Sequence, residues 1–239
     1  MPPAAKRAAL VTGAASGIGK AIAERLEADD WRVHAVDVAD GDLTTREGNR
    51  AVVDTALDRF GRLDAVVANA GFQHVAPLAE FPEERWDALV ALLLTSPFLL
   101  AKYAWDALAA SGDGRFLVVA SVHGLVASPF KAGYVAAKHG VLGLVKVLAL
   151  EGAEVGISAA ALCPSYVRTP LIESQIADQA RAHRVSEERV LKDVILAPQA
   201  VKRLLEPEDV ADAAAYLLGP RGRAVTGAPF VMDFGWTAR

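Results

Sequence analysis

Thr12-Gly13-Ala14-Ala15-Ser16-Gly17-Ile18-Gly19 is the stretch that decides the fold of this chain. It follows the short apolar run at 8–11 and opens a helical pattern over 18–26. A strand, a glycine turn and a helix N-terminus in this order form a cradle for phosphate groups, because glycines let the backbone approach the ligand and the helix dipole favours negative charge. The glycine spacing differs from the usual G-x-G-x-x-G fingerprint. The sequence still predicts a dinucleotide-binding α/β fold that begins here.

Outward from this turn, strand and helix patterns alternate along the whole chain, which is typical of parallel βαβ units. We therefore expect one doubly wound, Rossmann-like domain over residues 1–239. The segment 168–205 breaks the alternation with two short helical patterns, and we expect it to be a lid over the site. Strands are predicted near 8–12, 32–37, 64–68, 115–120, 157–162 and 228–232, and helices near 17–29, 44–60, 83–110, 132–151 and 207–218.

The composition narrows the class of protein. A chain of 239 residues with 53% hydrophobic and 23% charged residues is long enough for a self-sufficient core. The net charge of −4 argues against nucleic acid or an anionic membrane as partner, and no run of about 18 apolar residues indicates a membrane span. The first strand is expected after only seven residues, which leaves no room for a signal peptide. The single Cys163 fits a reducing compartment and is expected to be a buried hydrophobe, so we expect a cytoplasmic protein.

Tyr134-Val-Ala-Ala-Lys138 carries the chemistry that we expect. Residues four apart lie one above the other on a helix face. A tyrosine has a pKa of about 10, and an ammonium about 4 Å away would favour the phenolate by up to about 4 kcal/mol. We therefore expect Lys138 to lower the pKa of Tyr134 enough for proton transfer near neutral pH. Ser121, thirteen positions before Tyr134, would donate a hydrogen bond to the reacting oxygen. Alone, such a pair is more often a half-buried tyrosine beside a surface lysine.

Together these motifs resemble the short-chain dehydrogenase/reductase family, whose TGxxxGxG turn matches 12–19 and whose NNAG element matches Ala68-Asn69-Ala70-Gly71. The resemblance spans the chain and implies that Tyr134 is the general acid/base, with Ser121 and Lys138 as catalytic partners. We expect no metal, because the five histidines do not form a metal-ligand cluster. The residues implied to bind the cofactor are Gly13, Ser16, Gly17, Ile18, Gly19, Asp37, Asn69, Ala70, Gly71, Tyr134, Lys138, Pro164, Val167 and Thr169.

Asp37 at the end of the second predicted strand indicates which cofactor is used. A carboxylate there accepts hydrogen bonds from a ribose 2′-hydroxyl and repels a 2′-phosphate. Positions 14 and 15 are alanines, so the turn offers no cation to a 2′-phosphate. Both features favour NAD over NADP. A solvated turn carboxylate is the alternative interpretation of Asp37.

Several segments resemble the members of this family that interconvert D-3-hydroxybutyrate and acetoacetate. They are 72–77, 121–128, 134–140, 167–171 and 235–238. Lys131 and His123 lie close in sequence to Tyr134 and Ser121, and a cation with an imidazole suits a small carboxylate. The resemblance adds Gln73 and Gln175 to the substrate-binding set of Ser121, His123, Lys131 and Tyr134, and implies a homotetramer. A sugar, polyol or 3-oxoacyl dehydrogenase and a non-catalytic dinucleotide-binding protein remain alternatives.

Two features depart from the family pattern. The predicted strands at 32–37 and 64–68 are separated by one helix only, so we expect six strands instead of seven, with 32–37 at the sheet edge. Leu93 stands where the family has an asparagine in its catalytic tetrad. Pro97, four residues later, cannot donate a hydrogen bond to the Leu93 carbonyl, and we expect the long helix to be disrupted there.

Overall fold

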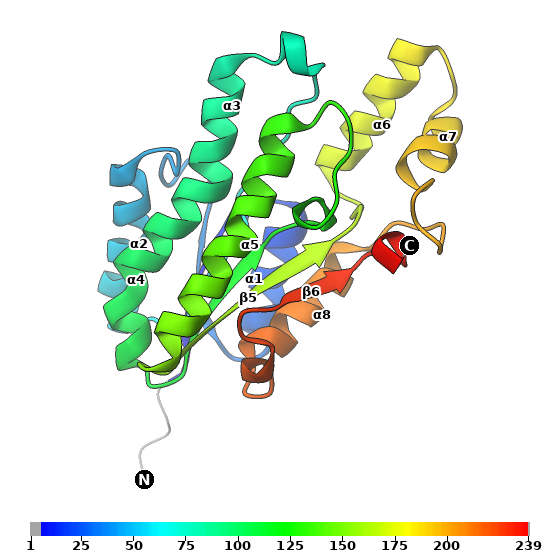
Figure 1. Ribbon diagram of the computed structural model, residues 1–239. Helices are drawn as coiled ribbons and strands as arrows, with labels where there is room; N and C mark the ends of the chain where they lie inside the picture. The colour runs from blue at the N-terminus through cyan, green and yellow to red at the C-terminus, as the bar shows by residue number, and fades with distance from the viewer. Residues whose placement is uncertain (1–5, 239) are drawn as a thin grey trace.

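The computed structural model describes residues 6–238, apart from the side chains of residues 178, 179, 182 and 183. A parallel six-stranded sheet forms its centre, in the order β2-β1-β3-β4-β5-β6 (Figure 1). The strands are β1 (Ala8–Thr12), β2 (Arg32–Val36), β3 (Ala65–Ala68), β4 (Gly114–Val119), β5 (Ile157–Pro164) and β6 (Pro229–Met232). The predicted doubly wound parallel sheet is therefore confirmed.

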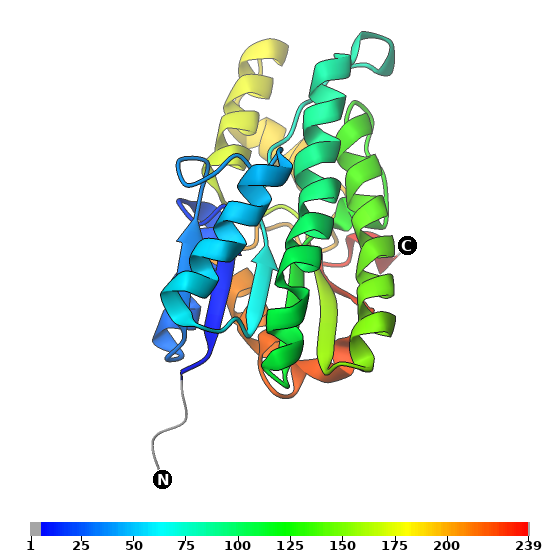
Figure 2. The ribbon, with the colours of Figure 1, turned by 90° about the vertical axis from the view of Figure 1, so that its left-hand side faces the viewer.

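Helices cover both faces of this sheet (Figure 2). One face carries α2 (Arg46–Phe60), α4 (Ser96–Ala110) and α5 (Ala132–Ala153), and the other carries α1 (Gly17–Ala28) and α8 (Pro207–Leu218). Because strand side chains alternate between the two faces, Leu10 of β1 packs into the first layer while Ala9 and Val11 pack into the second. All residues of β1, β3, β4 and β5 are buried, as expected of central parallel strands.

The predicted six-stranded sheet is confirmed, with β2 at its edge. The chain runs from β2 to α2 through the short connection 37–45. Gly48 in the first turn of α2 allows this connection to pack closely, because a Cβ there would lie 2.1 Å from the Asp42 carbonyl oxygen. Within the described residues, the shortened segment leaves β2 without a further strand beside it, so the connection itself forms the end of the ligand site.

The predicted helix over 83–110 forms as three consecutive pieces. These are α3 (Glu83–Val90), a π-helical turn at Ala91–Thr95 and α4. In the π turn the N–H of Ser96 reaches back five residues to the Ala91 carbonyl. Pro97 lies in the first turn of α4, where a missing N–H costs least. The disruption therefore spans the turn before the proline, since the helix rearranges its hydrogen bonds ahead of the residue that cannot donate one.

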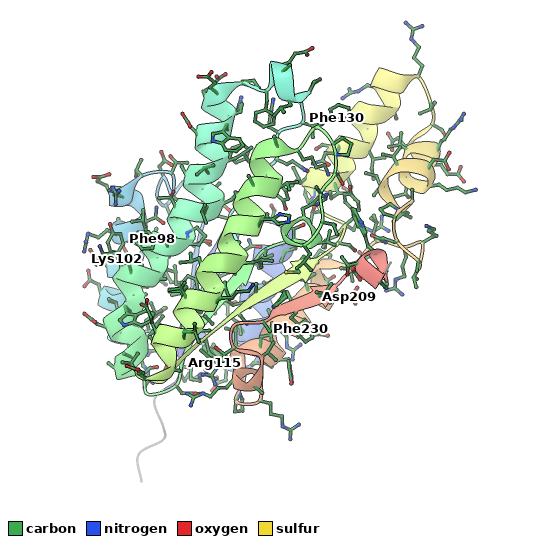
Figure 3. The ribbon with its side chains drawn as sticks, in the orientation of Figure 1. Phe98, Lys102, Arg115, Phe130, Asp209 and Phe230 are labelled. Atoms are coloured by element: carbon green, nitrogen blue, oxygen red, sulfur yellow. The ribbon has the colours of Figure 1, made fainter. Side chains whose placement is uncertain are left out.

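Two helical stretches, Glu83–Ala110 and Ala132–Ala153, are long and apolar enough to cross a membrane by length and composition. Both pack against the sheet, as core helices do. On the outer side of α4, Phe98 and Lys102 point away from the sheet (Figure 3).

The segment after β5 folds into a small helical unit with its own core. It contains α6 (Pro170–His183), α7 (Glu187–Val190) and a π turn at Leu191–Ile195. Its buried side chains form a cluster separate from the two sheet layers: Ile172, Ile176, Ala180, Val190, Ile195, Leu196 and Leu204. The chain re-enters the sheet region through the bridge between Val167 and Leu205. A unit with its own core and a narrow connection is suited to act as the predicted lid.

Candidate active site

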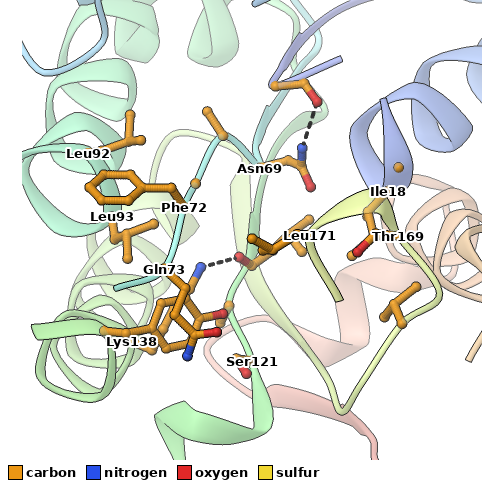
Figure 4. A pocket seen from close by; sticks show the side chains of 18 of the residues that line it. Ile18, Asn69, Phe72, Gln73, Leu92, Leu93, Ser121, Lys138, Thr169 and Leu171 are labelled. Atoms are coloured by element: carbon orange, nitrogen blue, oxygen red, sulfur yellow. Dashed lines mark hydrogen bonds between the residues drawn. The ribbon is translucent and has the colours of Figure 1, made fainter. Parts of the chain in front are cut away.

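A cavity of about 500 Å³ opens at the carboxyl ends of the strands, where parallel sheets place their ligand sites. Figure 4 shows Leu92, Leu93 and Phe72 on one wall, Ser121 and Lys138 near its base, and Ile18 and Thr169 on the opposite side. Among the predicted site residues, all of which the structure describes, only Gly19 and Gln175 do not line this cavity. The structure therefore brings together residues that are far apart in the sequence.

The glycine turn has the geometry of a phosphate cradle. Gly13 and Gly17 have φ angles of +66° and +52°, which side-chain-bearing residues rarely adopt. A Cβ at Gly13 would lie 2.8 Å from the Ala70 Cα atom. Asn69 holds the turn from below, because its side-chain amide donates to the carbonyl oxygens of Thr12 and Gly13 at 2.9 and 3.2 Å. The open turn followed by the N-terminus of α1 fits a dinucleotide pyrophosphate.

Gly19 does not line the cavity; it allows helix α1 to pack closely against the glycine turn. A Cβ there would lie only 2.1 Å from the Gly13 carbonyl oxygen and 2.4 Å from the Asn69 side-chain nitrogen. The helix can therefore approach the turn only because residue 19 has no side chain. Ser16, the N-cap of α1, does line the cavity, and its side chain makes no capping hydrogen bond.

Asp37 lies at the far end of the cavity from Tyr134 and is held rigidly. Its carboxylate accepts hydrogen bonds from the N–H groups of Ala15 at 2.9 Å and Val38 at 2.8 Å. The connection that follows also lines the cavity, and sequence reasoning did not identify these residues as part of the site. They are Val38, Gly41, Asp42, Leu43 and Thr44. The short spacing between the second and third predicted strands could have identified these residues. A connection this short has to pass over the carboxyl end of the sheet, where the cavity lies.

Asp42 is ordered by its neighbour in this connection. Its side chain accepts hydrogen bonds from the Thr44 N–H at 2.9 Å and the Thr44 hydroxyl at 2.6 Å. These bonds to Thr44 lower the pKa of Asp42. This end of the cavity thus carries two carboxylates, Asp37 and Asp42, and the described residues of the lining include no arginine there.

Ser121, Tyr134 and Lys138 all line the cavity. Ser121 follows β4, and Tyr134 and Lys138 lie on successive turns of α5, as their spacing predicts. Lys138 is buried, and its ammonium donates to the Val119 carbonyl at 2.7 Å. The Ser121 hydroxyl lies near Tyr134 and lowers its pKa. The arrangement supplies one proton-transferring group, one hydrogen-bond donor and one cation around the same end of the cavity.

The predicted fall in the pKa of Tyr134 is wrong. Burial raises the pKa of Tyr134, although the hydrogen bond from Ser121 opposes this effect. The Lys138 nitrogen lies 5.6 Å from the centre of the Tyr134 ring, and burial lowers the pKa of Lys138 to about 8. Two groups that lose water together both resist ionisation, and this desolvation outweighs their attraction.

The end of the cavity that contains Tyr134 also holds a second buried cation, Lys131. Lys131 is 8% exposed, and burial lowers its pKa to about 8. Its ammonium hydrogen-bonds the Tyr166 hydroxyl at 3.3 Å and lies 5.3 Å from the ring centre. Tyr166 in turn stacks on Trp236, with ring centres 5.6 Å apart. Lys131 therefore lies against the Tyr166 ring, and Trp236 stacks on that ring.

Gln73 and Gln175 meet across the entrance. The Gln175 amide, on the lid helix α6, donates to the Gln73 side-chain oxygen at 2.7 Å. Gln73 follows the Asn69–Gly71 turn, so this bond joins the lid to the body of the protein. Gln175 reaches the cavity only through Gln73, which explains why it lies just outside the lining.

His123 is buried between two serines. Its Nδ1 lies 3.5 Å from the Ser121 hydroxyl and its Nε2 lies 2.9 Å from the Ser128 hydroxyl. Burial, with the positive charge of Lys131 as the next cause, lowers the pKa of His123 to about 3. The imidazole is therefore neutral at physiological pH.

Leu93 fills the position where the resemblance expected an asparagine. It is buried in the π turn, and a Cβ at Gly71 would lie 2.8 Å from its Cδ2 atom. Its side chain packs against the Asn69–Gly71 turn and makes this wall apolar. Cys163 is buried, and desolvation raises its pKa to about 11, so it is a protonated thiol. Among the described residues of 6–238, no group of three or more His, Cys, Asp or Glu side chains suits a metal ion.

Comparison with known proteins agrees with this architecture. The family described as enoyl-(acyl carrier protein) reductase, of the short-chain dehydrogenase type, matches residues 34–237. A D-beta-hydroxybutyrate dehydrogenase of Rhizobium meliloti is 41% identical over 98% of this chain and 99% of that protein. Another, of Cupriavidus necator, is 37% identical over 98% of each chain. The crystal structure of a variant actinorhodin polyketide ketoreductase with NADPH has a TM-score of 0.91 and 31% identity over 100% of both chains.

Proposed function

Because the chain belongs to the short-chain dehydrogenase/reductase family and is an oxidoreductase with a nicotinamide-dinucleotide-binding fold, we propose that it interconverts D-3-hydroxybutyrate and acetoacetate with NAD as cofactor. The proposal goes beyond family membership, since relatives of similar fold act on other alcohols and ketones, such as a polyketide.

The observation that carries the proposal is the environment of Lys131. A buried ammonium is costly unless an anion or several acceptors surround it. Within the described part of the chain, its one hydrogen bond is to the neutral Tyr166 hydroxyl, and no carboxylate pairs with it. A small carboxylate entering the cavity would supply the missing charge. A thioester or a sugar has no such group to offer.

The rest of the cavity suits a four-carbon 3-hydroxy acid. Ser121 and Tyr134 would hold the oxygen at carbon 3, while Lys131 and the Gln73 amide, which Gln175 holds in place, would bind the carboxylate at carbon 1. Tyr166 and Trp236 would contact the remaining methyl group, and His123 would pack against the substrate from the base of the site. The site would thus contact the carbon-3 oxygen, the carboxylate and the methyl group at three different places. Only one enantiomer can make all three contacts while it presents the hydrogen on carbon 3 to the nicotinamide.

In the reaction, the bound nicotinamide would accept a hydride from carbon 3 or return it. Tyr134 would take up the hydroxyl proton on its phenolic oxygen, and Ser121 would donate a hydrogen bond to the developing carbonyl. The raised pKa keeps Tyr134 protonated, which is the form needed before acetoacetate is reduced. Lys138, although its pKa is lowered, would retain enough positive charge near neutral pH to stabilise the phenolate.

The choice of NAD rests on Asp37. Its carboxylate is held at the end of the second strand by the Ala15 and Val38 N–H groups, in position to accept a bond from a ribose hydroxyl. Asp42 adds a second negative charge to the same region. A 2′-phosphate would meet two carboxylates there.

A panel of substrates tests the proposal. We expect NAD reduction with D-3-hydroxybutyrate, weak activity with its L enantiomer, and a kcat/KM about 10- to 100-fold lower with its uncharged methyl ester, since a hydrogen bond to a charged group contributes about 1.5–3 kcal/mol. Lys131→Met should lower kcat/KM for the acid and leave that for the ester unchanged.

Equal activity with acid and ester in the unmodified protein would exclude Lys131 as a carboxylate site. Oxidation of a sugar or polyol at a higher kcat/KM than D-3-hydroxybutyrate would favour another dehydrogenase of this family. Cofactor binding without turnover of any member of the panel would indicate a non-catalytic protein.

A further inference from the structure

Tyr166 lies where the body of the protein meets the lid. It follows β5, lines the cavity and packs against the core of the lid unit. Its backbone carbonyl accepts the N–H of Leu205 at 3.0 Å, which ties together the two ends of the lid segment. Its ring stacks on Trp236 and meets the His123 ring edge-on, with ring centres 5.6 and 6.4 Å apart. Because these contacts hold the ring in one orientation, the fold also fixes the position of its hydroxyl.

The Tyr166 oxygen has one hydrogen-bond partner, and that partner determines how the hydroxyl is used. The Lys131 ammonium bonds this oxygen at 3.3 Å. An ammonium can only donate, so the oxygen accepts and the hydroxyl proton has to point in another direction. Among the residues that the structure describes, no group accepts this proton. Tyr166 therefore presents an unused donor in the wall of the cavity.

The same hydroxyl keeps its proton where the neighbouring lysine loses charge. Burial, with the charge of Tyr134 as the next cause, raises the pKa of Tyr166 to about 12. Burial lowers the pKa of Lys131 to about 8. An anion that enters this part of the cavity near neutral pH thus meets a neutral donor that does not ionise, next to a cation.

The two donors are close enough to bind one carboxylate together. A carboxylate has two oxygens that only accept, so one of them can accept from Lys131 while the other accepts from Tyr166. Lys131 can keep its bond to the Tyr166 oxygen in this arrangement, and that bond polarises the hydroxyl and makes it a stronger donor. An ester offers only a neutral carbonyl oxygen and would gain less from either donor.

We propose that the Tyr166 hydroxyl binds the substrate carboxylate and that Tyr166 and Lys131 act as one pair that selects short carboxylic acids. The inference rests on the proposed function and deepens it, since it assigns a second donor to the recognition of the anion. The ring of Tyr166 remains available for the methyl group of the substrate, because only the hydroxyl takes part in this pair.

Tyr166→Phe tests the inference, since it removes the hydroxyl and retains the ring that stacks on Trp236. The probe is butyrate, titrated by calorimetry near neutral pH into the protein saturated with NAD. We expect butyrate to bind about tenfold more weakly to the variant, because a hydrogen bond to a charged group is lost, and NAD to bind as it does to the unmodified protein.

Turnover gives a second measure of the same contact. In Tyr166→Phe, KM for D-3-hydroxybutyrate should rise about tenfold while kcat changes less than about twofold, because the hydroxyl binds the unreactive end of the substrate. The kcat/KM for the methyl ester should fall less than about threefold. The ratio of acid to ester is compared within each variant, so a smaller fraction of folded protein does not alter it.

A double-mutant cycle tests whether the two residues act as a pair. The loss of butyrate affinity in Lys131→Met with Tyr166→Phe should be smaller than the product of the two single losses, because each residue polarises or orients the other. Losses that multiply would show two independent contacts and would overturn the pair. Tyr216→Phe is the matched control, since it removes the hydroxyl of an exposed tyrosine that packs on Phe230 and does not line the cavity.

The remaining outcomes separate this inference from the proposed function. If butyrate binds Tyr166→Phe as tightly as the unmodified protein, the role of the hydroxyl is refuted while the proposed function stands. A fall in kcat with unchanged butyrate affinity would also refute it, because Tyr166 would then only order the lid. If the unmodified protein binds no butyrate, the carboxylate site itself is refuted, and both proposals fail.

Discussion

Lys131 shows how one buried charge sets both the selectivity and the pH range of a site. Burial lowers its pKa to about 8 because the ammonium loses water and gains no carboxylate within the described chain. An anionic ligand would favour the charged form and raise this pKa on binding. The same residue therefore titrates within the range in which dehydrogenases are assayed.

We predict that affinity for a short carboxylate falls as pH rises through about 8. Below this value Lys131 is charged and attracts the anion, whereas above it the neutral amine does not, so binding should weaken about tenfold per pH unit. The inhibition constant of butyrate, an unreactive carboxylate, measures the effect without contribution from the chemical step. In Lys131→Met the alkaline loss should disappear and binding should be weak throughout. A constant value from about pH 7 to 10 in the unmodified protein would contradict the assignment.

Asp37→Ala should weaken NAD binding about 10- to 100-fold and reduce the preference for NAD over NADP. The physical reason is the loss of a charged acceptor for the ribose hydroxyls, together with less repulsion of a 2′-phosphate. Dissociation constants of both cofactors, measured by fluorescence titration, give the result. Asp54→Ala removes an equal charge from an exposed position on α2 and serves as control. A stronger affinity of the unmodified protein for NADP would overturn this prediction.

Among the elements, α2 and α4 are joined through one buried polar residue. Asn49 donates to the carbonyl oxygens of Leu43 at 2.7 Å and Thr45 at 2.6 Å, and accepts from the Ser96 hydroxyl at 2.6 Å. Ser96 follows the π turn, so the amide ties the connection after β2 to the disrupted helix. In this way the shortened edge of the sheet keeps a defined shape.

Asn49→Ala should therefore affect both stability and the cofactor. Leaving buried carbonyl and hydroxyl groups without partners costs about 1–3 kcal/mol, which corresponds to a fall in Tm of several degrees. NAD should also bind less tightly, because Leu43 and Thr44 line its end of the cavity. Thermal unfolding and cofactor titration measure the two effects. Ser96→Ala, which removes only one of the three bonds, should show a smaller loss of each, and an equal or larger loss would argue against a clamp centred on Asn49.

For the whole molecule, the outer faces of α4 and α5 are unusually apolar. Phe98 is 43% exposed, Val147 48% and Leu150 77%. Exposed apolar patches of this kind commonly mark contacts between subunits. The resemblance to the family implies a homotetramer, and by analogy we expect these two helices to pack between subunits; both remain predictions.

Leu150→Glu should weaken this association, because four like copies would place charges in an apolar contact. Sedimentation or light scattering should show a shift from tetramer to smaller species at micromolar concentration. Lys146→Glu, a charge change one turn earlier on α5, is the control and should have less effect. A monomer in the unmodified protein would refute the expectation.

Local patterns were enough to predict the elements and much of the site. The cradle at 12–19 depends on glycines next to each other in sequence, and the Tyr134–Lys138 pair depends only on helical spacing. The short distance between the second and third strands likewise predicted a six-stranded sheet with β2 at its edge. These features follow from backbone geometry within a few residues, so neighbouring residues determine them.

Tertiary structure alone decided the remaining features, because each depends on burial or on contacts between distant segments. The Gln73–Gln175 bond joins residues about a hundred positions apart, and the Asn49–Ser96 bond joins two helices. The pKa of Tyr134 rises where the sequence predicted a fall, since desolvation is set by everything that packs around the group. Spacing places two side chains on one face of a helix, but only the folded chain determines how much water each of them keeps.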